Sequence, residues 1–135
     1  MLGIRDAEHE ESAPGALNLL ISRLASSLVG AEQTIKILPG SVAHRAYGRD
    51  EVTEKFACNY GFNPAFRSKF KNCPLRITGV DLEGEARVVE IVEHPFYVAT
   101  LYLPQISSEP GTPHPLFVAY LNAASAFRAS MLKKQ

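Results

Sequence analysis

Three predicted strands follow one another between residues 75 and 103, and this run limits the possible fold more than any other part of the sequence. The first two, residues 75–81 and 86–92, flank the tetrapeptide LEGE, whose Gly84 suits a hairpin turn. The third, residues 96–103, is apolar on both faces, which is typical of a central strand covered on both sides. The sequence therefore predicts a sheet that contains at least one antiparallel hairpin.

Shorter signals on either side complete a mixed α/β pattern. Residues 32–40 alternate apolar and polar side chains and end in Pro-Gly, as a strand does, and residues 51–62 begin in the same way. Residues 16–25 suit either a strand or a short helix. Helices are predicted over residues 41–48, with a serine N-cap and a glycine stop, over residues 64–70, and from Pro115 to Lys134.

Composition limits the class of protein. The 135 residues fit one domain, and 46% hydrophobic with 21% charged residues is typical of a soluble globular chain. A net charge of zero gives no support for nucleic-acid binding, which needs clustered Lys and Arg. No apolar run approaches the ~20 residues of a membrane span. The acidic N-terminal segment does not resemble a signal peptide, so we expect a cytoplasmic protein.

The two cysteines, Cys58 and Cys73, lack the CxxC spacing of redox and zinc motifs, and in the cytoplasm free thiols are expected. The four histidines are scattered along the chain, whereas a metal site needs three or four converging ligands. We therefore expect no metal and no cofactor.

Several segments together resemble a known family. They are ILPGSVAHRAYG, EVTEKFACNYGFN and the long run from GVDLEGE through HPFYVATLYLPQ to SSEPGTPHPLF. In this order they are similar to the C-terminal half of the class I glutamine amidotransferase domain of CTP synthase, and to a group of proteins related to its C-terminal region. The resemblance covers nearly the whole chain and implies a flavodoxin-like α/β domain. It places the nucleophile elbow and the first strands of the sheet ahead of Leu2, so residues 1–135 are expected to form a single partial domain.

The family hydrolyses glutamine with a cysteine nucleophile, a histidine base and a glutamate that orients the histidine. The resemblance implies that the histidine and glutamate positions are Leu103 and Gln105 here. Leucine cannot accept a proton, and a carboxamide has no charge with which to stabilise an imidazolium. An arginine that the family uses beside its substrate pocket corresponds to Asn59. We therefore expect no catalytic residue and no glutaminase activity in this chain.

The resemblance also gives four pocket candidates: Cys58, Asn59, Tyr60 and Asn63. Cys58 is either a reactive thiol or a small space-filling side chain, and the second interpretation is favoured because a reactive thiol needs a nearby cation. Tyr60 and Asn63 match the family and are expected to line the pocket wall, although Tyr60 could equally serve packing alone. We expect Leu103 to pack into the core and Gln105 to bind loop backbone.

Two histidines have local interpretations. His94 precedes Pro95 and is expected to act in a turn, and His114 precedes Pro115 and is expected to cap the last helix. Neither is expected to be a ligand.

These features predict a pseudoenzyme related to an enzyme of pyrimidine biosynthesis, acting as a binding or assembly module. The alternative is the C-terminal part of a longer enzyme whose missing half supplies a cysteine or selenocysteine. In either case a strand that is apolar on both faces needs cover. We therefore expect self-association into a homo-oligomer, or a partner that supplies the N-terminal half.

Overall fold

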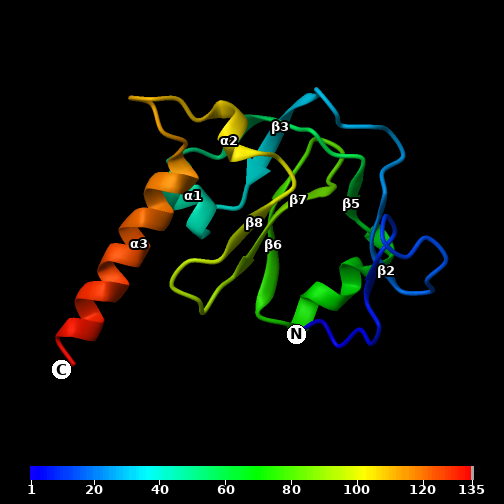
Figure 1. Cartoon of the computed structure of the whole chain (residues 1–135), viewed down its shortest axis with the longest axis horizontal. Coiled ribbons are helices and arrows are strands. Elements are labelled where there is room, and N and C mark those ends of the chain that lie inside the picture. Colours follow the sequence, from blue (N-terminus) through cyan, green and yellow to red (C-terminus); the bar gives the residue numbers. More distant parts are fainter. Residues whose placement is uncertain (135) are drawn as a thin grey trace.

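A computed structural model describes residues 1–134, which form two sheets and flanking helices (Figure 1). The elements in chain order are β1 (Glu8–His9), β2 (Leu19–Arg23), β3 (Glu32–Ile37), α1 (Val42–Tyr47), β4 (Glu51–Lys55), β5 (Tyr60–Phe62), the 3₁₀ helix η1 (Pro64–Asn72), β6 (Leu75–Val80), β7 (Ala86–Ile91), β8 (Val98–Thr100), α2 (Pro104–Ser107) and α3 (Pro115–Leu132). The larger sheet has the order β4-β3-β6-β7-β8 with every pairing antiparallel. The smaller sheet has the order β1-β2-β5. The predicted mixed α/β class, with antiparallel hairpin strands and a C-terminal helix, is confirmed.

The predicted hairpin is formed by β6 and β7. Gly84 has φ +85°, a left-handed conformation that glycine adopts without steric cost. Asp81 holds the turn, because its Oδ1 accepts hydrogen bonds from the amides of Glu83 at 3.1 Å and Glu85 at 2.8 Å. The other carboxylate oxygen pairs with Arg87 Nη2 at 2.7 Å, and both side chains are buried.

The prediction of a central strand over residues 96–103 is wrong. The strand is only three residues long and pairs with β7 alone among the described residues, so β8 is an edge of the larger sheet. The apolar residues around it have another cause. Tyr102 is fully buried and packs edge-on against Phe56, with ring centroids 5.9 Å apart. The apolar pattern of this segment therefore correctly indicated that its side chains are buried, but it did not indicate how many strands lie beside it.

A buried carboxylate binds the N-terminus of helix α1. The Ser41 hydroxyl caps the amide of His44, as predicted, and Glu90 of β7 accepts from the amides of Val42 at 2.9 Å and Ala43 at 2.8 Å. The negative charge at this helix N-terminus is favourable because the first amides lack helical partners. The contact ties α1 to the sheet, and the core between them contains Ile35, Ile37, Ala43, Val52, Phe56, Val88, Tyr102 and Leu116.

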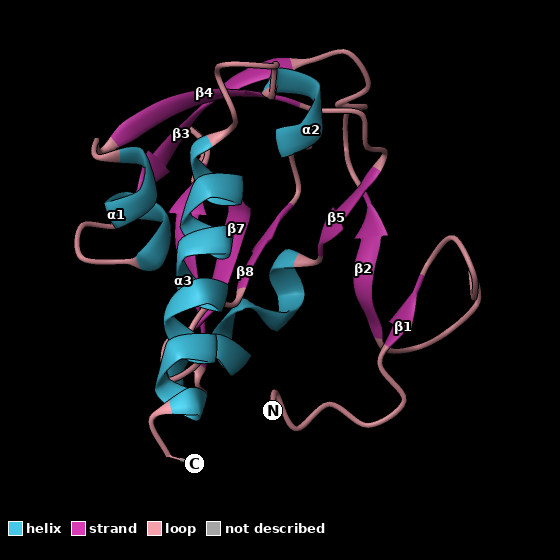
Figure 2. Cartoon of the chain, turned by 60° about the vertical axis from the view of Figure 1, so that its left-hand side comes forward, coloured by secondary structure: helices cyan, strands magenta, loops and turns pink. Residues whose placement is uncertain are grey.

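Helix α3 begins at Pro115, as predicted, and runs beside α1 along one side of the larger sheet (Figure 2). Its C-terminal end points away from the rest of the chain (Figure 1). Leu116 is its buried residue, while Phe117, Val118, Tyr120, Leu121, Phe127, Met131 and Leu132 are exposed apolar side chains. Helices that are apolar on all sides are normally covered by other structure.

Candidate functional site

The turn after β8 presents an aliphatic side chain and an amide. Leu103 precedes Pro104, the first residue of α2, and its backbone N–H donates to the carbonyl of Lys55 at 3.1 Å. The side chain of Leu103 is half-buried and lies outside the core cluster, and Gln105 is exposed. Within residues 1–134 the Gln105 side chain makes no hydrogen bond, so the expectations of a core leucine and a backbone-bound glutamine are both wrong.

A cluster of four polar side chains, three of them buried and one half-buried, lies next to this turn. Its members are Tyr47 of α1, Glu54 of β4, Tyr102 and His114. Glu54 Oε1 lies 2.8 Å from His114 Nε2 and accepts from the Tyr47 hydroxyl at 2.6 Å. The Tyr102 hydroxyl lies 3.0 Å from that of Tyr47. We call this group the Glu54–His114 cluster, and it joins two helices, a strand and the segment that enters the turn.

The hydrogen bonds define the state of the imidazole. His114 Nδ1 accepts from the amide of Leu116 at 3.2 Å, so it carries a lone pair and caps α3 as predicted. Nε2 therefore carries the proton and donates it to Glu54 Oε1. Both nitrogens are engaged and the side chain is 3% exposed. His114 is thus not available as a general base for a group bound outside the cluster.

Burial also sets the acidity of the two phenols. Desolvation, together with the neighbouring Tyr102 and the hydrogen bond to Glu54, raises the pKa of Tyr47 far above its ordinary value. Desolvation likewise raises the pKa of Tyr102 above its ordinary value. Both hydroxyls therefore stay protonated at neutral pH and act as hydrogen-bond donors, not as bases.

The four pocket candidates lie on the segment that follows β4. Cys58 is half-buried and Asn59 is exposed. Asn63 caps η1 through Oδ1, which accepts from the amide of Ala65 at 3.0 Å, and its Nδ2 donates to the carbonyl of Leu19 at 2.9 Å. Both ends of the Asn63 side-chain amide are therefore engaged by the fold. The turn and this segment do lie together, since Leu103 bonds to the end of β4.

Tyr60 has a partner that sequence reasoning missed. Arg23 of β2 lies opposite Tyr60 in the smaller sheet, donates to its hydroxyl at 3.2 Å and places its guanidinium 5.3 Å from the ring centroid. The ring of His9 lies 5.1 Å from that of Tyr60 on centroids. Tyr60 is therefore held by side chains rather than by backbone, in a half-exposed aromatic and cationic arrangement.

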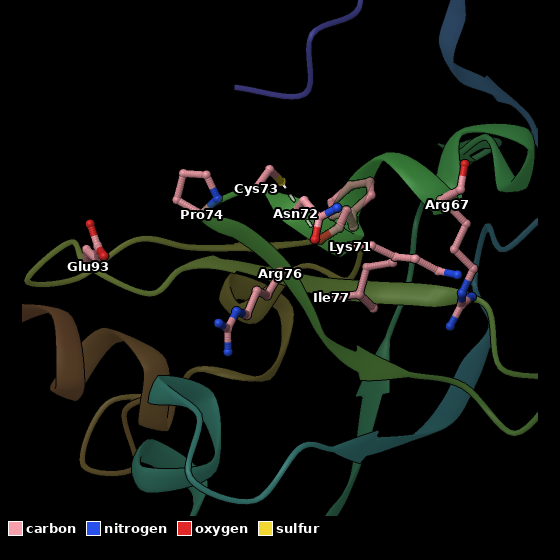
Figure 3. A pocket seen from close by; sticks show the side chains of 10 residues that line it. Arg67, Lys71, Asn72, Cys73, Pro74, Arg76, Ile77 and Glu93 are labelled. Atoms are coloured by element: carbon pink, nitrogen blue, oxygen red, sulfur yellow. Dashed lines mark hydrogen bonds between the residues drawn. The ribbon is translucent and has the colours of Figure 1, made fainter.

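An open groove of about 810 Å³ lies elsewhere, beside η1 and the start of β6 (Figure 3). It contains the cations Arg67, Lys71 and Arg76, but Figure 3 shows Arg76 extending away from the other two, so the charges do not converge on one point. None of the four pocket candidates lines it. In the described part of the chain no group of His, Cys, Asp and Glu is arranged to hold a metal ion, and no helix has the length and apolar content needed to cross a bilayer.

Comparisons with known proteins show which sequences and folds the chain is similar to. No protein-family model matches the sequence. CTP synthase of Saccharopolyspora erythraea is 41% identical over 100 residues, which is 70% of this chain and 17% of that protein. CTP synthase of Synechococcus sp. (strain WH7803) is 34% identical over 134 residues, which is 92% of this chain and 25% of that protein. The chain thus spans a quarter or less of the length of these relatives.

The fold has a solved counterpart. The glutaminase domain of Trypanosoma brucei CTPS, solved with bound acivicin, matches with a TM-score of 0.84 at 20% identity, over 93% of this chain and 53% of that one. The fold is therefore that of part of a class I glutamine amidotransferase domain. Within that class, the chain resembles the C-terminal half of the glutaminase domain of CTP synthase.

Proposed function

We propose that this chain is a catalytically silent amidotransferase-like module of the CTP synthase type, which acts by binding or assembly. The observation that carries the proposal is the composition of the turn. Where the resemblance places a histidine and a glutamate, the turn presents Leu103 and Gln105, and the neighbouring buried imidazole of His114 has both nitrogens engaged.

The chemistry explains why these replacements matter. Attack on a carboxamide by a thiol requires a base to remove the thiol proton and later to protonate the leaving ammonia. Neither a leucine nor a glutamine can do this. Because triad members act as a unit, the loss of one costs on the order of 10⁴–10⁶ in rate. A cytoplasmic location and a link to pyrimidine biosynthesis belong to the same proposal.

Glutamine turnover by the purified chain tests the catalytic part of this proposal. Glutamate and ammonia are measured together, with a buffer blank and an active glutaminase run in parallel. The expected rate equals the blank. Turnover proportional to protein concentration, and abolished by Cys58→Ser, would contradict the proposal and identify the nucleophile.

The assembly part of the proposal is supported by α3. Leu121 is 62% exposed and Phe127 54% exposed, and α3 carries several further exposed apolar side chains along its length. Covering them would release ordered water at a gain of roughly 25 cal/mol per Å². We infer that a second copy, or a polypeptide that supplies the remainder of the amidotransferase domain, covers this helix.

Light scattering at rising protein concentration tests self-association. We expect an assembly that Leu121→Glu weakens, whereas Asn122→Glu, at the neighbouring exposed position, serves as the matched control. A monodisperse monomer at high concentration would exclude the second copy and leave the separate polypeptide as the partner to be sought.

The second candidate function is a thiol- or selenol-dependent enzyme of which this chain is the C-terminal part. It is favoured by one observation, namely that the chain covers only 53% of the solved glutaminase domain that it matches. The test is the reading frame upstream of the Met1 codon. An in-frame glycine-rich elbow with a cysteine or TGA codon supports this candidate, and an unrelated gene there supports the silent module.

A further inference from the structure

A hollow of about 200 Å³ lies between α3 and the loop that joins β7 to β8. Phe96 of the loop packs edge-on against Tyr120 of the helix, with ring centroids 5.6 Å apart. The helix side of the hollow consists of Tyr120, Ala123, Ala124 and Phe127. These residues occupy positions i, i+3, i+4 and i+7, the four that frame a hole for a side chain of another helix. The hollow therefore has the form that a neighbouring helix would fill.

Exposed apolar side chains continue along the same helix on both sides of the hollow. The α3 seam, as we call it, repeats at alternating intervals of three and four residues and consists of Phe117, Tyr120, Ala124, Phe127 and Met131. This spacing is typical of a helix that pairs with a second helix. The C-terminal end of α3 points away from the rest of the chain (Figure 1), so a second helix can lie along it.

The order of side-chain sizes in the seam is the same in both directions. Ala124 lies at its middle, two large side chains precede it and two large side chains follow it. In an antiparallel pair of α3 helices the large side chains therefore face one another, and the two Ala124 residues lie at the two-fold axis. A two-fold interface requires a patch that is complementary to itself. The seam thus fits a second copy of this chain.

The charge on the helix indicates the same partner and also the direction of packing. Arg128 is the only charged residue from Pro115 to Leu132, and it lies next to the seam. A parallel pair would bring the two Arg128 side chains together, whereas an antiparallel pair places each near Tyr120 of the other copy. A guanidinium over a phenol ring is favourable, and two adjacent guanidinium groups are not. Charges beside a seam are what select a different chain as partner, and α3 offers only this one.

We propose that α3 packs antiparallel against α3 of a second copy of this chain. Each helix places a side chain in the hollow of the other copy, and each Arg128 guanidinium lies over the Tyr120 ring of the other copy. The inference rests on the assembly part of the proposed function, to which it adds the partner and the direction of packing, and it is independent of the catalytic part.

Cysteine cross-linking of the full chain tests the direction of packing. Cys58→Ser and Cys73→Ser are made first, so that only the introduced thiols react. Phe117→Cys and Met131→Cys are then oxidised separately and as a mixture, and the products are identified by intact mass. We expect the mixture to form a mixed disulfide dimer. In either variant alone the two thiols lie about 20 Å apart, too far for a disulfide, so no cross-link is expected.

The matched control is Asn122→Cys mixed with Met131→Cys, because Asn122 is exposed on the side of α3 away from the seam. The proposal is overturned if the Phe117→Cys and Met131→Cys mixture does not exceed this control, or if Met131→Cys alone cross-links as readily as the mixture. Light scattering separates two failures. A dimer without the mixed disulfide overturns this inference alone, and a monomer at high concentration also overturns self-association in the proposed function.

Arg128→Gln tests the charge contact through the Kd of the dimer, measured by sedimentation equilibrium. Loss of two symmetric cation–π contacts is expected to raise the Kd about fivefold. Tyr120→Leu should raise it similarly, and the double variant little further, because both changes remove the same contact. Lys133→Gln, beyond the seam, is the control and should change the Kd less than about twofold. An unchanged or lower Kd in Arg128→Gln would contradict the proposal, and a lower one would indicate a parallel pair.

Discussion

The Glu54–His114 cluster and the Leu103–Gln105 turn are joined where Tyr102 precedes Leu103, and they differ in burial and in hydrogen bonding. In the cluster, Tyr102 is fully buried, and Glu54 and His114 are each 3% exposed. In the turn, Gln105 is exposed to solvent. A buried polar group that loses a partner incurs its full desolvation cost, while an exposed one is solvated by water. The fold is therefore expected to tolerate substitution at the turn but not substitution of the polar groups of the Glu54–His114 cluster.

Removal of His114 is expected to have the largest effect on stability. His114→Ala removes a hydrogen bond from the buried Glu54 carboxylate and uncaps α3, which together should cost about 2–4 kcal/mol. His114→Asn is the matched variant, because its shorter side chain still caps a helix and should recover about 1 kcal/mol. Urea unfolding measures both. A loss below about 1 kcal/mol for His114→Ala would remove the contrast between the two regions.

High pH is expected to destabilise the fold by ionising the two tyrosine hydroxyls of the cluster. The folded pKa values of Tyr47 and Tyr102 are raised by burial, while the unfolded value is about 10. Their stabilising effect is therefore complete below about pH 10 and is lost above it, by up to about 1.4 kcal/mol per pH unit for each tyrosine. Unfolding free energies measured from about pH 9 to 12 check this. Tyr47→Phe should flatten the decline, and an unchanged slope in that variant would contradict the assignment.

The turn itself should be tolerant. Gln105→Ala removes an exposed side chain without a hydrogen bond among the described residues, so we expect a stability change within about 0.5 kcal/mol. Urea unfolding again measures it, with Ser107→Ala, another exposed position of α2, as the control. A change comparable to that of His114→Ala would mean that the turn contributes as much to the stability of the fold as the cluster does.

The smallest effect is expected at the thiol of the neighbouring segment. Cys58 is half-buried, and within residues 1–134 its sulfur takes part in no hydrogen bond, unlike that of Cys73. A thiol without a stabilising partner is not activated as a nucleophile. It should react with a disulfide reagent no faster than glutathione does, as measured by the time course of the released thiol. Cys73→Ser isolates the signal of Cys58, and a rate well above that of glutathione would make the thiol a functional candidate.

Local signals made much of the fold predictable from sequence. The hairpin turn at Gly84, the serine cap of α1 and Pro115 at the start of α3 depend on a few consecutive residues, and each was correctly placed. The edge position of β8 was not predictable, because an apolar pattern records burial without saying which element covers it.

The cluster depends on contacts that sequence does not express. Glu54 and His114 are 60 residues apart, and their pairing follows from tertiary packing. One signal was present: Glu54 lies between Val52 and Phe56 on the buried phase of an alternating strand, where a carboxylate requires a partner. The same signal marks Glu90 beside Val88, and that residue caps α1. Acidic residues in buried phases would have indicated both contacts.

The protonation state of the His114 ring tests the central claim most directly. We assign to His114 a neutral imidazole whose Nε2 proton is donated to Glu54 and whose Nδ1 lone pair accepts the N–H of Leu116. Two-dimensional ¹H–¹⁵N NMR of the ring nitrogens at neutral pH should therefore find Nε2 protonated in slow exchange with water and Nδ1 bare. A bare Nε2, or a ring proton in rapid exchange with solvent, would mean that this imidazole is free to accept a proton, and the account of a silent site would be wrong.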